Sequence, residues 1–116
     1  MGTDEEIITQ AYYAFNARDI DAVLAVLHPD VAWANGMDGG YVYGHAAVRD
    51  YWTRQWLLID PHVEPQGMTR DATGQIHVAV HQVVHDLTGT LLGDRQVQHV
   101  YRIENGLVQR MEIHEI

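Results

Sequence analysis

Histidine is the residue type in this sequence whose side chain could most readily carry chemistry. Eight of the 116 residues are histidine, and cysteine and serine are both absent. A thiol or serine nucleophile, a disulfide and a thiolate metal site are therefore excluded. An unperturbed imidazole has a pKa of about 6.5, so a histidine in a binding site could act as an acid or a base at neutral pH.

Three of the histidines, His77, His81 and His85, are spaced four residues apart. On a helix, this spacing would bring the three imidazoles close enough to bind one metal ion. Segment 75–87, however, is rich in valine and is flanked by glycine turns, which favours a strand. Residues four apart on a strand are separated by about 13 Å, so they cannot hold one ion. We therefore expect neither a metal site nor a cofactor.

The side chains of this strand alternate between the two faces of a sheet. One face carries mainly aliphatic side chains, and the pattern alone predicts that this face packs against the core. The other face carries the three histidines. The aliphatic face consists of Ile76, Val78, Val80, Gln82 and Val84, and the histidine face of His77, Ala79, His81, Val83 and His85.

Hydrophobic periodicity and turn residues predict the elements that position these side chains. Thr3 and Glu6 fit a capping box at the start of a helix, and Asn105-Gly106 is a strong signal for a β-hairpin. Proline cannot continue a helical hydrogen-bond ladder, so the His28-Pro29 and Asp60-Pro61 steps end helices. We expect helices over 3–18, 19–27 and 44–58, and strands over 31–35, 62–70, 75–87, 96–104 and 107–114.

This order of elements, three helices followed by a meander of strands, indicates an α+β fold. We expect a single domain over residues 1–116, in which a cone-shaped, curved and mainly antiparallel sheet wraps around the three helices of the N-terminal half. Such an arrangement encloses a pocket, and pockets of this kind commonly hold ligands.

The composition argues against several classes of partner. The net charge is −9, and the seven basic residues, all arginine, are scattered along the chain, so we expect no binding of nucleic acid. No run approaches the roughly 18 apolar residues that a membrane span needs. The acidic start does not resemble a secretory signal. We therefore expect a cytoplasmic protein that binds no membrane.

Four segments, taken in order, carry a resemblance to a known family. They are AYYAFNARDIDAV at 11–23, LHPDVAW at 27–33, GHAAVRDY at 44–51 and YRIENGLV at 101–108. Together they resemble the SnoaL-like branch of the nuclear-transport-factor-2-like superfamily. That superfamily includes ketosteroid isomerases, polyketide cyclases, epoxide hydrolases, dehydratases and non-catalytic binding proteins, so the resemblance is specific for fold and weak for function.

The ketosteroid isomerases of this superfamily use a carboxylate base, with a tyrosine and a protonated aspartate as the oxyanion hole. In this sequence the position of the base falls on Asn35, and that of the protonated aspartate falls near His99. The position of the tyrosine falls on Ala11, one residue before Tyr12. The resemblance therefore argues against a standard ketosteroid isomerase, yet it places Asn35 and His99 in the pocket. Asp38, in the glycine-rich loop that follows, is a weaker candidate for a base.

The resemblance also implies an inward face for the long strand. It places the histidine face toward the pocket and leaves the valine face to pack against a second subunit, so we expect a homodimer through the outer face of the sheet. Our catalytic candidates are then His99, His81 and Asn35, with Asp38 weaker. We expect the following residues in the pocket wall: Tyr12, Phe15, Trp33, Tyr51, Trp52, Val83, His85, Val97 and Tyr101.

Three functional hypotheses follow from these observations. The first is a small enzyme of the isomerase, cyclase or lyase type that acts on a small hydrophobic molecule by histidine acid–base chemistry. The second is a non-catalytic binding module for a hydrophobic metabolite, in which the histidines are simply hydrogen-bonded and semi-buried. The third is a structural dimerisation domain whose cavity is filled by aromatic side chains.

Overall fold

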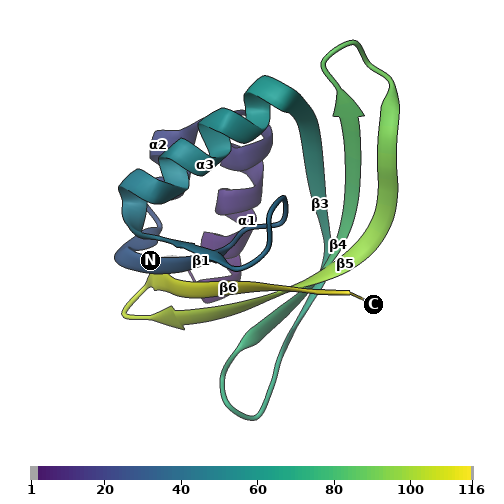
Figure 1. The fold of residues 1–116 in the computed structure, drawn as a ribbon. Helices are drawn as coiled ribbons and strands as arrows, with labels where there is room; N and C mark the ends of the chain where they lie inside the picture. Colours follow the sequence, from purple (N-terminus) through teal and green to yellow (C-terminus); the bar gives the residue numbers. More distant parts are fainter. Residues whose placement is uncertain (1–2, 116) are drawn as a thin grey trace.

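The computed structural model describes residues 3–115 of the chain, and its helices occupy the N-terminal half (Figure 1). Helix α1 spans Asp4–Asn16, and Thr3 caps it by accepting a hydrogen bond of 3.2 Å from a backbone N–H of the first turn. Helix α2 spans Ile20–Leu24 and helix α3 spans Gly44–Leu58. The predicted capping box therefore supplies its N-cap hydrogen bond, and the three predicted helices are all present.

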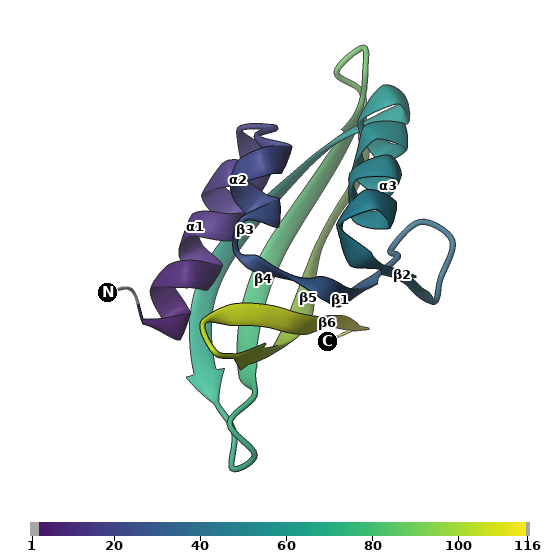
Figure 2. The ribbon, with the colours of Figure 1, turned by 90° about the vertical axis from the view of Figure 1, so that its left-hand side faces the viewer.

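The strands form one curved, unclosed sheet with the order β2-β1-β6-β5-β4-β3. Strands β1 and β6 are parallel, and the other neighbouring strands are antiparallel. Figures 1 and 2 show the three helices on the same side of this sheet. The predicted α+β fold is confirmed. The strand bounds are β1 Leu27–Ala34, β2 Tyr41–Tyr43, β3 Ile59–Arg70, β4 Ile76–Asp86, β5 Leu91–Glu104 and β6 Leu107–Glu115.

The region around the first strand differs from the sequence-based prediction. Helix α2 ends at Leu24, because the chain already pairs with the sheet at Val26, whose carbonyl accepts a hydrogen bond of 2.9 Å from Val108 N. Pro29 lies inside β1 rather than at a helix end. The register of β1 against β6 shifts between Leu27 and Ala32, so the proline falls where the ladder is interrupted. Strand β2 was not predicted, since three residues are too few to show alternation.

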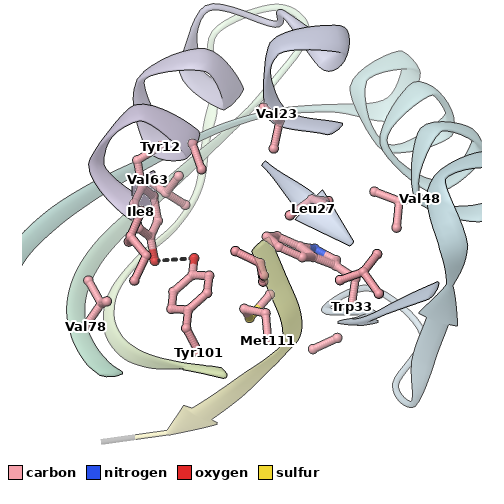
Figure 3. Packing of buried hydrophobic residues seen from close by; sticks show 14 of the residues in the cluster. Ile8, Tyr12, Val23, Leu27, Trp33, Val48, Val63, Val78, Tyr101 and Met111 are labelled. Atoms are coloured by element: carbon pink, nitrogen blue, oxygen red, sulfur yellow. Dashed lines mark hydrogen bonds between the residues drawn. The ribbon is translucent and has the colours of Figure 1, made fainter. Parts of the chain in front are cut away.

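The core lies between the helices and the sheet, and Figure 3 shows side chains from both layers converging there. Ile8 of α1, Trp52 of α3 and Tyr101 of β5 are at most 2% exposed. Trp33 of β1 packs edge-on against Trp52, with ring centroids 5.3 Å apart. Full burial of a large apolar side chain stabilises a fold by about 1.5–3 kcal/mol, so these contacts hold the helices on the sheet.

The face of the sheet that points toward the helices is called the inner face here, and the opposite one the outer face. On β4 the inner face carries the aliphatic side chains, and Val78 and Val80 are completely buried. The histidine face is the outer one, so the inward face inferred from the family resemblance is wrong and the one inferred from the pattern is right. The reason is that the helices cover one side of the sheet, and the valines gain most from that cover.

Among the described residues, no helix is long and apolar enough to cross a membrane.

Candidate functional site

A cavity of about 440 Å³ opens between α3, the loop after β1 and the inner face of the sheet. Most of its wall is apolar or aromatic, with side chains that include Phe15, Trp33, Tyr41, Trp52, Met111 and Ile113. A smaller set of polar side chains faces the same space. These are Asn35, Gln55, Gln82, Arg95, His99 and Glu115, together with Tyr51.

His99 is the buried polar residue of this wall, with 6% of its surface exposed. It comes from the inner face of β5 and meets Tyr12 of α1, whose Oη lies 2.6 Å from His99 Nδ1. Tyr101 Oη donates a hydrogen bond of 2.8 Å to Tyr12 Oη, drawn as a dashed line in Figure 3. Because the Tyr12 hydroxyl accepts from Tyr101, its own proton is available for His99 Nδ1.

This chain of hydrogen bonds favours one tautomer of His99. With Tyr12 as the donor of the hydrogen bond to Nδ1, the neutral imidazole carries its own proton on Nε2. Nε2 has no hydrogen-bond partner among residues 3–115, and the ring lines the cavity. The arrangement therefore presents one N–H donor, backed by two buried tyrosines, to whatever occupies the cavity.

Burial also decides the charge of this cluster. It lowers the pKa of His99 from its ordinary value of 6.5 to about 4. It raises the pKa of Tyr12 and that of Tyr101, so both hydroxyls keep their protons. We expected His99 to titrate near neutral pH, and burial corrects that expectation. At pH 7 the imidazole is neutral and acts as a hydrogen-bond donor rather than as a proton acceptor.

A second polar group lies on the α3 side of the cavity. Tyr51 Oη accepts hydrogen bonds from Gly36 N at 3.0 Å and from Gln55 Nε2 at 3.2 Å. Gln55 Oε1 is buried and has no partner among the described residues. Turning the amide by half a turn keeps its shape, and Oε1 then accepts from the Tyr51 hydroxyl while Nε2 loses its partner. In either orientation, one amide group of Gln55 is buried without a partner among the described residues.

Asn35 lies in the wall but is committed to the loop that follows it. Its Oδ1 accepts hydrogen bonds from Met37 N at 3.0 Å and Asp38 N at 2.9 Å. Asp38 itself is exposed and borders a shallow neighbouring cleft rather than the cavity. The structure therefore does not place the Asp38 carboxylate where a base in this cavity would need to be.

The other predicted site residues fall into three groups. His81 is on the outer face, where its Nε2 lies 2.6 Å from Asp94 Oδ1, and Val83 and His85 share that face, so none of the three meets the cavity. Val97 is buried in the core of the inner face. Tyr12 and Tyr101 are not in the wall of the cavity, but line a smaller one of about 30 Å³ together with His99. The residues in the cavity wall are Phe15, Trp33, Asn35, Tyr51, Trp52 and His99.

Several wall residues were missed at the level of sequence. Gln55 lies one helical turn after Tyr51, which is a spacing that could have indicated it. Arg95 continues the alternation of Val97 and His99, but the predicted strand began one residue too late to include it. Glu115 follows the end of the last predicted strand.

Comparison with known protein families identifies the family of this chain. The model of the SnoaL-like domain matches residues 8–111. This chain belongs to the SnoaL-like family. The resemblance seen in the four sequence segments is thereby confirmed. No curated protein matches the chain.

Solved structures agree with this assignment. An NTF2-like protein of unknown function from Burkholderia pseudomallei is 28% identical, with a TM-score of 0.85 over 100% of this chain and 92% of that one. TerC, co-crystallised with polyporic acid, is 26% identical, with a TM-score of 0.84 over 97% of this chain and 91% of that one. RV0760c from Mycobacterium tuberculosis, in complex with estradiol-17β-hemisuccinate, shares the fold at 16% identity, with a TM-score of 0.79 over 92% and 88% of the two chains.

Proposed function

We propose that this SnoaL-like domain binds an oxygenated, largely apolar small molecule in the cavity, and that His99 Nε2–H donates a hydrogen bond to an oxygen of that ligand. The observation that carries the proposal is the buried, neutral imidazole of His99, which lines the cavity and has one ring nitrogen, Nδ1, bound to Tyr12. The second ring nitrogen, Nε2, has no hydrogen-bond partner among residues 3–115, so a ligand oxygen could accept a hydrogen bond from it without displacing a protein group.

The remaining wall supports the same class of ligand. Aromatic side chains such as Trp33 and Trp52 offer flat apolar surface, while Tyr51 adds a polar group to the same wall. Two proteins of this fold have been crystallised with ligands that are apolar and carry oxygen, namely TerC with polyporic acid and RV0760c with estradiol-17β-hemisuccinate. A cavity of about 440 Å³ falls within the usual range for small-molecule sites.

A catalytic role of the isomerase, cyclase or lyase type is the second candidate, and the neutral, buried imidazole of His99 favours it. A neutral donor in a dry site stabilises an oxygen on which negative charge develops, as an enolate would carry. In this version His99 is the electrophile and not the base. Glu115 is the carboxylate of the described cavity wall, and it lies at the exposed mouth, so simple binding is the role that the geometry supports better.

A purely structural role is less well supported. Trp33, Tyr51 and Trp52 form the wall of an open cavity and do not fill it. The predicted homodimer through the outer sheet face stays a prediction. The valines that were expected to form its interface lie in the core, so the interface would have to use the outer histidines and their neighbours.

Calorimetric titration with polyporic acid tests the proposal. His99→Leu removes the Nε2–H donor at similar side-chain volume, and we expect it to weaken binding by about tenfold or more. His81→Leu is the matched control, because it removes an imidazole from the outer face of the neighbouring strand, and its affinity should equal that of the wild type. Binding that is lost in His81→Leu and kept in His99→Leu would contradict the proposal.

A further inference from the structure

Arg95 is the cation of the described cavity wall, and its hydrogen-bonding state sets it apart from the other arginines. It projects from the inner face of β5 and lines the cavity four residues before His99. The other six arginines each donate a hydrogen bond to a carboxylate or a backbone carbonyl within residues 3–115. Arg95 donates none there.

The carboxylate of Glu115 lies near Arg95 without binding it well. The shortest distance between Arg95 Nη1 and Glu115 Oε1 is 3.8 Å, too long for a hydrogen bond. The Glu115 side chain is 87% exposed and that of Arg95 is 58% exposed, so their attraction is weak. A ligand anion that met the guanidinium in a bidentate geometry would displace Glu115 at little cost.

The position of Arg95 relative to His99 defines two ends of the site. Four strand residues separate them, which is about 13 Å along β5. His99 lies at the buried end, where the wall is apolar and aromatic. Arg95 lies at the open end, opposite Gln82 in the register of β4 and β5. A ligand that spans the cavity meets a neutral N–H donor at one end and a guanidinium at the other.

We infer that Arg95 binds an acidic group of the ligand, and that the natural ligand is an apolar ring system with an oxygen at its buried end and a carboxylate at its exposed end. The inference rests on the proposed function, because it names the chemical class of the molecule that would occupy the same cavity. The guanidinium suits this role, since its donors match the two oxygens of a carboxylate.

A matched pair of probes tests the inference: estradiol-17β-hemisuccinate and its methyl ester, which differ in the charge of one end. Calorimetric titration of the wild type should show the acid binding roughly tenfold or more tightly than the ester, as a charge-assisted hydrogen bond implies. Arg95→Gln should abolish this preference, because the affinity for the acid should fall much more than the affinity for the ester. Glu115→Gln should increase the preference, because it removes the competing carboxylate.

Arg102→Gln provides the control. Arg102 is on the same strand, but it faces outward and is paired with Glu104, so its removal should leave both affinities as in the wild type. Equal binding of acid and ester to the wild type, or an undiminished preference in Arg95→Gln, would overturn the inference. If both probes bind equally and both are lost in His99→Leu, the proposed function stands and the assignment of Arg95 fails. If neither probe binds the wild type, the proposed function fails for this ligand class and the inference falls with it.

Discussion

Histidines on the two faces of the sheet differ in burial and in the kind of hydrogen-bond partner they have. His99, on the inner face, has a tyrosine hydroxyl as its partner and is buried. On the outer face His77 pairs with Asp71 at 2.8 Å and His81 pairs with Asp94 at 2.6 Å, and both side chains are partly exposed. A hydroxyl supports a neutral imidazole, whereas a carboxylate supports a charged one.

The pKa values move in opposite directions as a result. Burial lowers the pKa of His99 to about 4, while the hydrogen bond that His77 donates to Asp71, assisted by the one to Gln98, raises the pKa of His77 above its ordinary value. The number of histidines in the sequence therefore says little about the site. What matters is which imidazole is held away from carboxylates and close to the cavity, and within the described residues that one is His99.

Lowering the pH should destabilise the fold through His99 on the inner face. The pKa of His99 is 6.5 in the unfolded chain and about 4 in the folded one, so the unfolded state binds more protons between these values. This group should lower the free energy of unfolding by roughly 3 kcal/mol as the pH falls from 6.5 to 4. Urea denaturation at a series of pH values measures it. A His99→Leu variant should lose less stability over the same range, and an equal loss in both proteins would contradict the account.

Removing one hydroxyl from the relay should have the next largest effect. Tyr12→Phe leaves His99 Nδ1 and Tyr101 Oη without their shared partner in the core, and we expect a destabilisation of about 1–3 kcal/mol. Tyr13→Phe is the matched control on the same helix, because Tyr13 is 79% exposed, and its stability should stay within about 0.5 kcal/mol of the wild type. Thermal or urea unfolding compares them, and similar losses in the two variants would count against a structural relay.

The smallest effect is expected on the outer face, where the pH dependence of stability from His77 has the opposite sign to that from His99. Asp71→Asn removes the main cause of the raised pKa of His77, so the pKa should fall toward 6.5. A group with a raised folded pKa contributes stability that is present below pH 6.5 and lost as the pH rises through the folded value, which is the reverse of His99. Side-chain NMR titration reads both histidines in one sample. A His77 pKa that did not change in Asp71→Asn would show that the carboxylate is not its cause.

The architecture could be predicted because it is encoded locally. The capping residues of α1, the glycine-flanked valine run of β4 and the Asn105-Gly106 hairpin each specify an element within a few residues. The short strand Tyr41–Tyr43 escaped prediction because three residues carry no periodic signal. The valine pattern alone correctly predicts which face of β4 points inward. The inference from the family resemblance placed the opposite face inward and was wrong.

The site was harder to predict from the sequence, because it depends on contacts between distant segments. Tyr12 and His99 are 87 residues apart, and their hydrogen bond requires the packing of α1 onto β5, which no local pattern specifies. His99, Asn35 and the aromatic wall could be proposed from the alignment of strands with the family. Arg95 was lost because the predicted strand began one residue after it, and Gln55 because a glutamine on a helix is usually a surface residue.

The central claim is that His99 is a neutral donor to a ligand in the cavity, and the ¹H–¹⁵N NMR spectrum of the histidine side chains tests it most directly. Recorded from pH 8 to pH 4 with and without polyporic acid, the spectrum should show His99 with its proton on Nε2 and no titration above about pH 5. The ligand should shift the His99 Nε2 resonance and leave that of His81 unchanged. The account would be contradicted if His99 titrates near pH 6.5, or if its resonances do not shift when the ligand binds.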